Sequence, residues 1–376
     1  MTLVADNSLI FLFSKVKSLY SMLYLLQNLN FQKNQKVFLI LLCLIGTGCQ
    51  KPIALNEYTF RGSSMGTTFL VKIAAEKMSE QQQRKIYQTI RTKLSDINNK
   101  MSTYLDSSEI SHLNRFKKTI PLRLSAETLT VMAEAQLISR LTQGALDITI
   151  NPLVNAWGFG PEPHPSKIPT EKEISQLKSK IGWEKLELDF STSTIRKLDP
   201  EISCDLSAIA KGYAVDQLSD TLLRLNFLQH MVELGGEVKA SGHNASSQTW
   251  KIAIEKPSAL GEGIQRILPL SSLAMATSGD YRNFYDVKGV RFSHTIDPRN
   301  GRPVDHSVVS VSVVDPSCMR ADGYATALLV LGETKGYQLA TEQDLAVLFL
   351  IRTAQGSFRE IETPAFQRIY STGQSL

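Results

Sequence analysis

The stretch Asp205–Leu218 reads DLSAIAKGYAVDQL and belongs to the best-marked helix of the chain, predicted over Ser207–Leu225. Its buried face is supplied by apolar side chains at helical spacing, namely Leu206, Ile209, Tyr213, Leu218 and Leu222. Asp205 and Ser207 are both suitable N-caps, and Lys211 stands among small residues in the first turns. A helix N-terminus with a lysine suits phosphate, but a closely packed core helix with a solvated lysine has the same pattern.

The segments before this helix alternate between strand and helix patterns. Two strand-like runs within Tyr58–Ala75 are separated by Gly-Ser-Ser-Met-Gly, and the proline-rich stretch Pro161–Pro169 is expected to be an exposed loop. Helical periodicity predicts helices over three ranges, Ser79–Met101, Ala126–Thr142 and Glu171–Ile181. Short strands are expected at Leu186–Asp189, Thr194–Lys197 and Ile202–Cys204.

The segments after it are mostly strands. Strand patterns dominate His230–Val314, and a last helix over Arg320–Leu331 precedes the apolar strand Leu345–Arg352. Strands and helices are partly segregated, which favours an α+β fold over a regular βαβ series. Because no G-x-G-x-x-G follows a strand and no G-x-x-x-x-G-K-[ST] occurs, a standard dinucleotide or P-loop fold is disfavoured.

The composition is that of a globular protein. The 376 residues are 43% apolar and 20% charged, which is enough to build a full core. The formal net charge is +5, of which residues 1–48 contribute +3 (four lysines against one aspartate), so only +2 remains for the rest. That charge provides no electrostatic footprint for DNA or RNA, and we expect no nucleic-acid partner.

Residues 1–48 are expected to form a signal segment of the lipoprotein type, and residues 49–376 a single domain. Lys33 and Lys36 precede the apolar run Val37–Ile45, and small residues then lead to Cys49. The run is shorter than the ~20 residues that a bilayer-spanning helix needs. Cys49 is therefore the candidate for lipidation, although Gly46 stands where such signals usually have leucine. A plain secretory signal or an uncleaved anchor remains the alternative, and Met1 and Met22 are both possible starts.

Apart from Cys43 and the candidate lipidation site Cys49, the chain has two cysteines, Cys204 and Cys318. Two cysteines make no disulfide framework, and their spacing is not that of a metal site. They either pair in an oxidising compartment or remain two buried thiols.

Asp322 and Thr326 are spaced i, i+4, which places both side-chain oxygens on one face of the helix over Arg320–Leu331. A carboxylate with a hydroxyl is a partial shell for Mg²⁺, which leaves room for phosphate oxygens. The alternative is an N-capping aspartate and a threonine bonded to its own helix.

His294 precedes the turn sequence Asp-Pro-Arg-Asn-Gly and follows Thr277-Ser278-Gly279, which we interpret as a polar turn. A histidine titrates near neutral pH, so His294 suits a general base beside a phosphate and metal site. Taken alone, it is better explained as a structural histidine. His306 has no such neighbours and is expected to be structural.

Eight ordered blocks between about Tyr58 and Arg352 resemble the ApbE-type FAD:protein FMN transferases. The blocks are MGTTF, MSTYLDSSEISHLN, GALDITINPLVNAWGFG, DLSAIAKGYAVDQL, ELGGEVKASG, ATSGDYRNFY, SHTIDPRNGRPV and ADGYATALLVLG. The resemblance implies a T-fold-like α+β protein with mixed sheets and packed helices, in which FAD binds in a cleft between two lobes.

The resemblance also implies a reaction. Members of this family move FMN from FAD onto a threonine, or occasionally serine, hydroxyl of a target protein and release AMP, with Mg²⁺ as cofactor. Their usual acceptors are flavoprotein subunits of sodium-pumping NADH:quinone reductase and of Rnf-type complexes. Members are typically exported and many are lipoproteins, so we expect an inner-membrane lipoprotein that faces the periplasm.

The family's functional positions are matched as follows. The flavin- and nucleotide-contacting positions are Met65, Tyr104, Ala145, Leu146, Asp147, Asp205, Lys211 and Ile296. The metal positions are the carbonyls of Ala208 and Ala325 and the side chains of Asp322 and Thr326, and His294 matches the histidine proposed to act at the reacting centre. Leu146 replaces an aromatic residue, which predicts weaker FAD binding, and Gly323 stands where alanine is commoner.

Two other functions fit the same residues. A Mg²⁺-dependent FAD pyrophosphatase would use water in place of threonine, and a membrane-tethered flavin-binding protein would store or deliver FAD without catalysis. The Asp322 and Thr326 pair argues against pure binding, because storage needs no metal at the pyrophosphate. Asp297 or a metal-bound water is an alternative base to His294.

Overall fold

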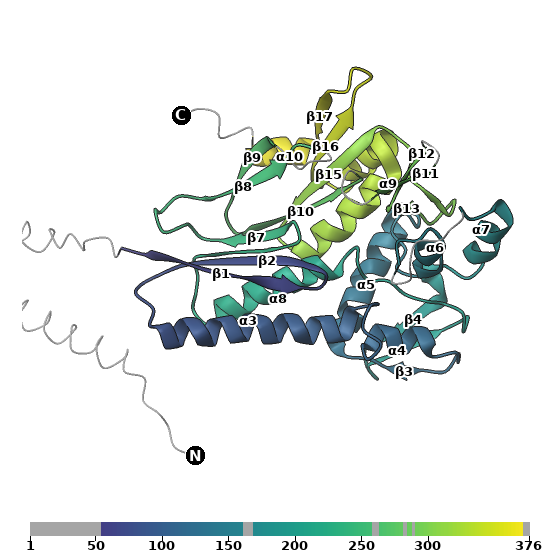
Figure 1. Ribbon diagram of the computed structural model, residues 1–376, viewed down its shortest axis with the longest axis horizontal. Coiled ribbons are helices and arrows are strands. Elements are labelled where there is room, and N and C mark those ends of the chain that lie inside the picture. The colour runs from purple at the N-terminus through teal and green to yellow at the C-terminus, as the bar shows by residue number, and fades with distance from the viewer. Residues whose placement is uncertain (1–53, 161–167, 258–262, 281–283, 288–289, 371–376) are drawn as a thin grey trace, which may run out of the picture. The chain divides into compact units, whose positions relative to one another are not determined.

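An eight-stranded antiparallel sheet organises the fold (Figure 1). Its strands, in spatial order, are β1 (Asn56–Ser64), β2 (Thr67–Ala75), β6 (His230–Leu234), β7 (Glu237–Ser241), β10 (Leu273–Gly279), β15 (Val308–Asp315), β16 (Ala346–Arg352) and β17 (Phe358–Glu362). This computed structural model describes residues 54–160, 168–257, 263–280, 284–287 and 290–370. The predicted signal segment, Cys49 and most of the predicted Pro161–Pro169 loop lie outside these ranges.

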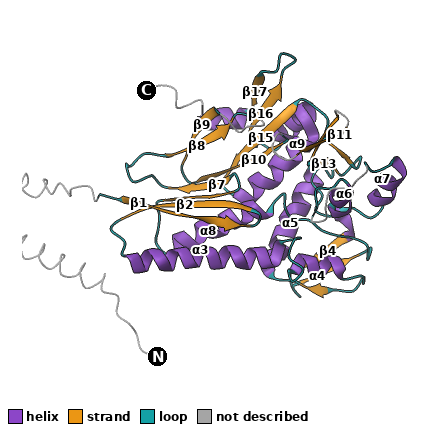
Figure 2. Cartoon of the chain, viewed as in Figure 1, coloured by secondary structure: helices purple, strands orange, loops and turns teal. Residues whose placement is uncertain are grey.

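Three helices cover one face of the sheet. They are α3 (Glu80–Met101), α8 (Ala210–Arg224) and α9 (Cys318–Glu342), with α5 (Ala126–Leu141) packed against α9. Figure 2 shows two of them, α3 and α8, beneath strands β1 and β2. Apolar side chains from the strands and the helices pack together into one core. It includes Val71, Val232, Val313, Leu218 and Leu328. The core on this face of the sheet is larger than the core on the opposite face.

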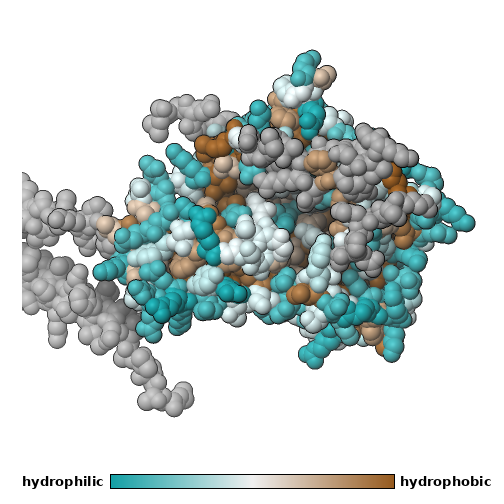
Figure 3. Space-filling model, viewed as in Figure 1, coloured by the Kyte–Doolittle hydropathy of each residue, from teal (hydrophilic) through white to brown (hydrophobic). Residues whose placement is uncertain are grey.

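The opposite face packs against a hairpin and the last helix. The hairpin consists of β8 (Trp250–Glu255) and β9 (Ile264–Leu270), and the helix is α10 (Pro364–Tyr370). Met231, Val238, Leu348 and Phe366 form this second core. Figure 3 shows that the viewed surface is mostly hydrophilic, with hydrophobic residues in separate patches.

Smaller elements complete the fold beside the main sheet. They are α4 (Glu109–Arg115), β3 (Leu122–Arg123), α6 (Asn151–Ala156), α7 (Glu171–Lys178), the 3₁₀ helix η1 (Trp183–Lys185), β4 (Leu186–Asp189), β5 (Thr194–Lys197), β11 (Phe284–Val287), β12 (Val290–Ser293), β13 (Ile296–Asp297) and β14 (Arg302–Pro303). A third apolar cluster, around Trp157, Ile174 and Ile296, packs α6, α7 and β13 together.

The predicted α+β class is confirmed, and residues Ala54–Leu376 form one compact unit. The helix predicted from Ser79 begins at Glu80, because Ser79 is its N-cap within a capping box with Gln82. In the part of the chain that the structure describes, no helix has the length and apolar character needed to cross a membrane.

The start of the predicted Ser207–Leu225 helix is wrong by three residues. Helix α8 begins at Ala210, and neither Asp205 nor Ser207 caps it. Asp205 instead accepts hydrogen bonds from the backbone N–H and the hydroxyl of Ser207. This local turn holds the segment outside the helix, since an aspartate bonded two residues ahead competes with helical hydrogen bonding.

The strand predicted at Ile202–Cys204 is also wrong, since Ser203 makes only an isolated bridge to Ile150. Side chains satisfy the backbone there instead of a neighbouring strand. Lys197 donates to the Ile202 carbonyl at 3.0 Å, and the Asn114 side chain bonds both the N–H and the carbonyl of Cys204, at 2.6 and 2.9 Å.

The last helix is longer than the predicted Arg320–Leu331. It runs from Cys318 to Glu342, with a non-helical residue, Gly332 (φ 74°), directly after the predicted end. Its N-cap is Ser317, so the N-cap interpretation of Asp322 does not hold. Cys204 and Cys318 are both buried free thiols.

Candidate active site

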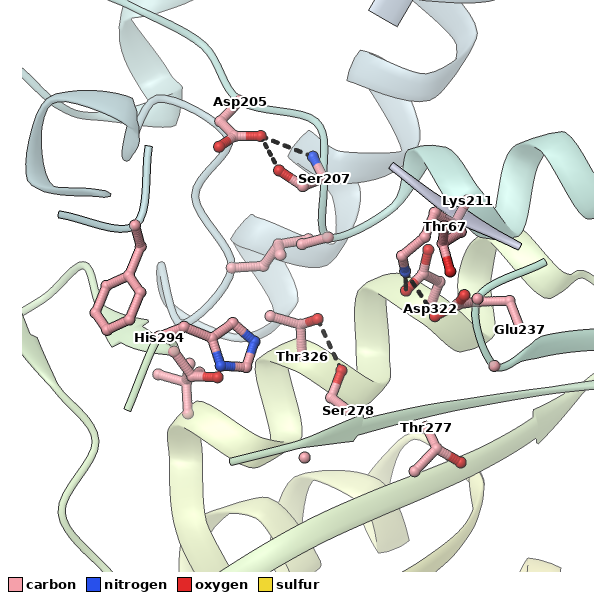
Figure 4. Close-up of a pocket in the computed structure, with 18 of the residues that line it drawn as sticks. Thr67, Asp205, Ser207, Lys211, Glu237, Thr277, Ser278, His294, Asp322 and Thr326 are labelled. Carbon is pink, nitrogen blue, oxygen red and sulfur yellow. Dashed lines mark hydrogen bonds and ion pairs between the residues drawn. The ribbon is translucent and has the colours of Figure 1, made fainter. Parts of the chain in front are cut away.

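A cavity of about 1110 Å³ opens among elements that are far apart in the sequence. Its wall includes the start of α8, the start of β7, the end of β10, one face of α9 and the loop after α5. Figure 4 shows the polar side chains of these elements pointing into it. The wall combines backbone-rich glycine turns, hydroxyls and charged groups, which suits a large polar ligand.

The charged centre of the cavity consists of Lys211, Glu237 and Asp322 (Figure 4). The Lys211 ammonium lies 2.6 Å from Glu237 Oε1 and 3.7 Å from Asp322 Oδ1. The side chains of Glu237 and Asp322 are only 4% and 3% exposed. Two buried carboxylates thus share a single ammonium.

This arrangement shifts the acidities of all three groups. Burial raises the pKa of Glu237 to about 7, against the opposing effect of Lys211. Burial likewise raises the pKa of Asp322, and Lys211 opposes it. Burial disfavours the charged form of Lys211, but the two carboxylates outweigh it and raise the pKa of Lys211. A second cation would therefore be stabilised here.

Gly212 allows α8 and α9 to approach closely beside this centre. A Cβ atom on Gly212 would lie 2.3 Å from the Cys318 carbonyl oxygen and 2.8 Å from Asp322 Cβ. The close approach lets the Gly212 N–H donate to Asp322 Oδ2 at 2.9 Å. The glycine in the quoted stretch is thus explained by helix packing that orients the Asp322 carboxylate.

Thr326 lies one turn after Asp322 on α9 and also lines the cavity. Its hydroxyl is 3.0 Å from that of Ser278. Ser278 belongs to β10, so the predicted polar turn at Thr277-Ser278-Gly279 is wrong: these residues pair with Ser310–Ser312 of β15. The Ser278 hydroxyl reaches the cavity from this strand, whereas the hydroxyl of its neighbour Thr277 lies 2.8 Å from that of Ser312, because adjacent residues of a strand point to opposite faces.

The oxygen donors at this point fit Mg²⁺. The described residues contain no cluster of three or more histidine, cysteine, aspartate or glutamate side chains suited to a metal. A cation bound here would instead take the carboxylate of Asp322, the hydroxyl of Thr326 and a backbone carbonyl such as that of Ala208, all of which belong to cavity-lining residues. Such a partial set of hard oxygens suits Mg²⁺, which retains waters and binds substrate phosphates.

His294 stands on the cavity wall between β12 and β13. Its ring meets that of Phe159 edge-on, with the centroids 6.3 Å apart. The turn that follows is rigid, because Asp297 accepts from Arg299 Nε at 2.8 Å and from its terminal nitrogen at 2.7 Å. Asp297 is thus committed to the turn, which weakens it as an alternative base.

Other expected positions surround the cavity at greater distance from the charged centre. Tyr104 is 67% exposed and lines the cavity, as a ring available for stacking would. Ala145, Leu146, Asp147, Asp205 and Ile296 also line it. Asp147 Oδ1 accepts from the N–H and the hydroxyl of Thr149 at 2.8 and 2.6 Å, and its Oδ2 accepts from the Trp183 N–H of η1 at 3.2 Å.

Met65 and Ala325 are the expected positions that do not line the cavity. Met65 has a positive φ of 51° and packs against the main core, and Ala325 is fully buried within α9. His306 is structural, as predicted: its Nε2 is 2.8 Å from the Leu329 carbonyl oxygen.

Sequence reasoning missed Glu237 and the two threonines Thr67 and Thr68, all of which line the cavity. One signal for Glu237 was available. A glutamate stands directly after Gly235-Gly236 at the start of a strand, and it points toward α8, where a buried charge needs a partner.

Comparisons with known proteins show the family of this chain and agree with its fold. The ApbE family profile matches residues 65–349. A relative from Vibrio cholerae, named FAD:protein FMN transferase, is 41% identical over 87% of this chain and 96% of its own. A Haemophilus influenzae protein of the same name is 39% identical over 89% and 97%.

Solved structures agree as well. The flavin transferase ApbE from Vibrio cholerae superposes with a TM-score of 0.77 at 40% identity, covering 84% of this chain and 99% of that one. The apo flavinyl transferase ApbE of Pseudomonas stutzeri gives the same TM-score at 33% identity, covering 85% and 98%. Since both its sequence and its fold match, this chain belongs to the ApbE family.

Proposed function

We propose that this protein transfers FMN from FAD to a threonine or serine hydroxyl of an acceptor protein, forms a phosphoester and releases AMP. One observation carries the proposal. A single cavity gathers Lys211, Asp322, Thr326 and His294 in a chain that matches FAD:protein FMN transferases along almost their whole length.

The size of the cavity supports a large substrate. Its volume of about 1110 Å³ exceeds the usual range of ~300–1000 Å³ for small-molecule sites. That leaves room for a dinucleotide together with a segment of an acceptor protein.

The proposed step is a phosphoryl-group transfer. The acceptor hydroxyl oxygen forms a bond to the FMN phosphorus of FAD, and the bond from this phosphorus to the bridging oxygen breaks. The bridging oxygen and its electron pair leave with AMP, and His294 takes the hydroxyl proton. Lys211 offers its positive charge to the pyrophosphate, since such transfers depend chiefly on positioning and electrostatics.

We propose Mg²⁺ as the cofactor, held by Asp322, Thr326 and the Ala208 carbonyl. When bound there, the ion would neutralise charge on the pyrophosphate oxygens. The chain's own contribution is to fix the carboxylate, which the Gly212 N–H does at 2.9 Å.

We further propose that the acceptors are flavoprotein subunits of sodium-pumping NADH:quinone reductase or of Rnf-type complexes. The protein would act as an inner-membrane lipoprotein, anchored through Cys49 and facing the periplasm. The basic, apolar and small-residue pattern that ends at Cys49 supports the anchor.

The test of the activity incubates the protein with FAD, Mg²⁺ and a threonine-bearing acceptor, then measures covalent flavin fluorescence on a denaturing gel. Labelled acceptor and equimolar AMP are expected. Release of AMP and free FMN without labelling would make the protein an FAD pyrophosphatase instead. Bound and unchanged FAD would make it a carrier.

Asp322→Ala is expected to abolish FMN transfer and to leave the fold intact. The substitution removes the carboxylate proposed to hold the metal, while the packing of α8 against α9 remains. Flavin labelling measures the loss, and circular dichroism measures the fold. Full activity of this variant in Mg²⁺ buffer would contradict the metal assignment.

A further inference from the structure

The ammonium of Lys211 is paired unequally with two equally buried carboxylates. Its nitrogen lies 2.6 Å from Glu237 Oε1, a direct hydrogen-bonded ion pair, but 3.7 Å from Asp322 Oδ1, beyond hydrogen-bonding distance. Asp322 lies on α9 and Glu237 on β7, so the two carboxylates approach Lys211 from different elements. Figure 4 shows the three side chains converging.

The buried position of Glu237 carries a cost in folding free energy. Its Oε2 atom is buried and makes no hydrogen bond within the described residues. A buried acceptor without a partner is a desolvation penalty, so a stabilising role does not by itself explain a glutamate here. Its position is fixed, because it follows directly on the turn Gly235–Gly236, where φ is +65° and +106°.

We infer that Glu237 is a positioning residue that holds the Lys211 ammonium away from Asp322 and so keeps the Asp322 carboxylate available to a divalent cation. Without Glu237, Lys211 would close onto Asp322, the remaining carboxylate beside it. The ammonium would then neutralise the Asp322 carboxylate, whose negative charge a divalent cation needs. The inference rests on the proposed function, because that function gives Asp322 its cation.

The same strand contains a matched control. Lys239, two residues after Glu237 on β7, pairs with Asp216 of α8 at 2.7 Å, and the two side chains are 18% and 13% exposed. Glu237 and Lys239 share one strand face, and each pairs with an opposite charge on α8. The Lys239 pair lies outside the cavity, beside Ser317 and the start of α9.

The test titrates the full-length protein with Mn²⁺ alone and follows the heat of binding. The variants are Glu237→Gln, Lys211→Met, the double variant and Lys239→Met. Glu237→Gln removes the charge but keeps an oxygen that accepts from Lys211, so folding is preserved. We expect it to weaken Mn²⁺ binding about tenfold, which corresponds to ~1.4 kcal/mol.

The double variant decides how Glu237 acts. If Glu237 acts through Lys211, its substitution should have little effect once the Lys211 ammonium has been removed. Adding Glu237→Gln to Lys211→Met is then expected to change Mn²⁺ affinity by less than about twofold. A tenfold loss in that background as well would overturn the inference, since Glu237 would then act on the cation directly. Unchanged Mn²⁺ affinity in Glu237→Gln would overturn it too.

Two further measurements separate this inference from its alternatives. Lys239→Met is expected to lower the melting temperature without changing Mn²⁺ affinity, which controls for loss of an ion pair between β7 and α8. Flavin labelling of an acceptor by the unaltered protein tests the proposed function separately. If the acceptor is labelled but Glu237→Gln leaves the Mn²⁺ affinity unchanged, this inference alone is rejected. If Glu237→Gln weakens Mn²⁺ binding but the unaltered protein labels no acceptor, the transferase function alone is rejected.

Discussion

Lys197 shows at the level of one residue how this chain uses a buried charge. It is 1% exposed, and its ammonium donates to the carbonyls of Leu113, Pro200 and Ile202 at 3.0–3.1 Å. A lysine carries three donors and no acceptor, so all three protons are used. The side chain thereby joins the last turn of α4 to the irregular segment that contains Pro200 and Ile202.

Lys197→Met is expected to destabilise the protein by about 2–5 kcal/mol, because three buried carbonyls lose their donor. Urea unfolding monitored by circular dichroism measures this change. Lys185→Met is the control, since Lys185 is only partly buried and makes one exposed hydrogen bond, to the Ser179 carbonyl at 2.7 Å. Equal stability of the two variants would show that the Lys197 contacts contribute little.

Gly323 and Leu146, the two expected departures from the family pattern, are neighbours in the structure. A Cβ on Gly323 would lie 2.6 Å from Ile138 Cδ1 and 3.6 Å from Leu146 Cδ2. Leu146 lies both in the main core and on the cavity wall. The small residue on α9 thus accommodates Ile138, in the same packing layer as the leucine that replaces an aromatic.

At the level of elements, the packing of α8 against α9 positions Asp322 in the site. Gly212→Ala is expected to destabilise the protein by about 1–3 kcal/mol, since the new methyl group meets backbone that cannot move aside. Separation of the helices would also lengthen the hydrogen bond to Asp322, so Mn²⁺ affinity should fall in parallel. Calorimetry and thermal melting measure both effects. A variant as stable as the parent would contradict the close packing.

A buried histidine links α8 to β6. His230 is 0% exposed, with Nδ1 2.8 Å from the Phe227 carbonyl oxygen and Nε2 2.8 Å from the Ser219 hydroxyl. A carbonyl only accepts, so Nδ1 carries the proton and Nε2 accepts from Ser219. Burial, with the charge of Lys239 in support, lowers the pKa of His230.

The contribution of His230 to stability is therefore expected to fall as the pH is lowered below about 6.5, the ordinary histidine pKa. Above that pH the imidazole is neutral in both the folded and the unfolded chain, and its contribution is fully present. Below it the unfolded chain takes up a proton first, and the contribution is lost until the pH passes the lower pKa of the folded protein. Urea unfolding at a series of pH values measures the slope. His230→Gln should flatten it, and an unchanged slope would assign the effect to other groups.

At the level of the whole molecule, the cavity wall joins residues from Thr67 to Val330. A ligand that contacts so many separate elements stabilises the folded state by mass action. FAD with Mg²⁺ at one hundred times its dissociation constant is expected to add ~2.7 kcal/mol of stability. Thermal melting at increasing FAD concentration measures the effect, with riboflavin, which lacks the pyrophosphate, as the weaker control. A melting temperature independent of FAD would place its binding elsewhere.

Much of the fold was predictable because its elements have strong local signals. The helices over α3, α5 and α7 and the strands β4 and β5 followed from periodicity and from caps such as Ser79. The predictions that were wrong, at Ser207, Ile202–Cys204 and Thr277-Ser278-Gly279, lie where side chains or distant strands satisfy the backbone. Local patterns contain no information about those partners.

The sequence by itself determined the α+β class, most helices and strands, and the residue types that gather at the site. Lys211, Asp322, Thr326 and His294 were all recognisable from their motifs. Only the tertiary structure decided that Glu237 holds Lys211 and that Gly212 orients Asp322. The physical reason is that hydrogen bonds and ion pairs act over about 3 Å in space, whereas these partners lie 26 and 110 residues apart in the chain.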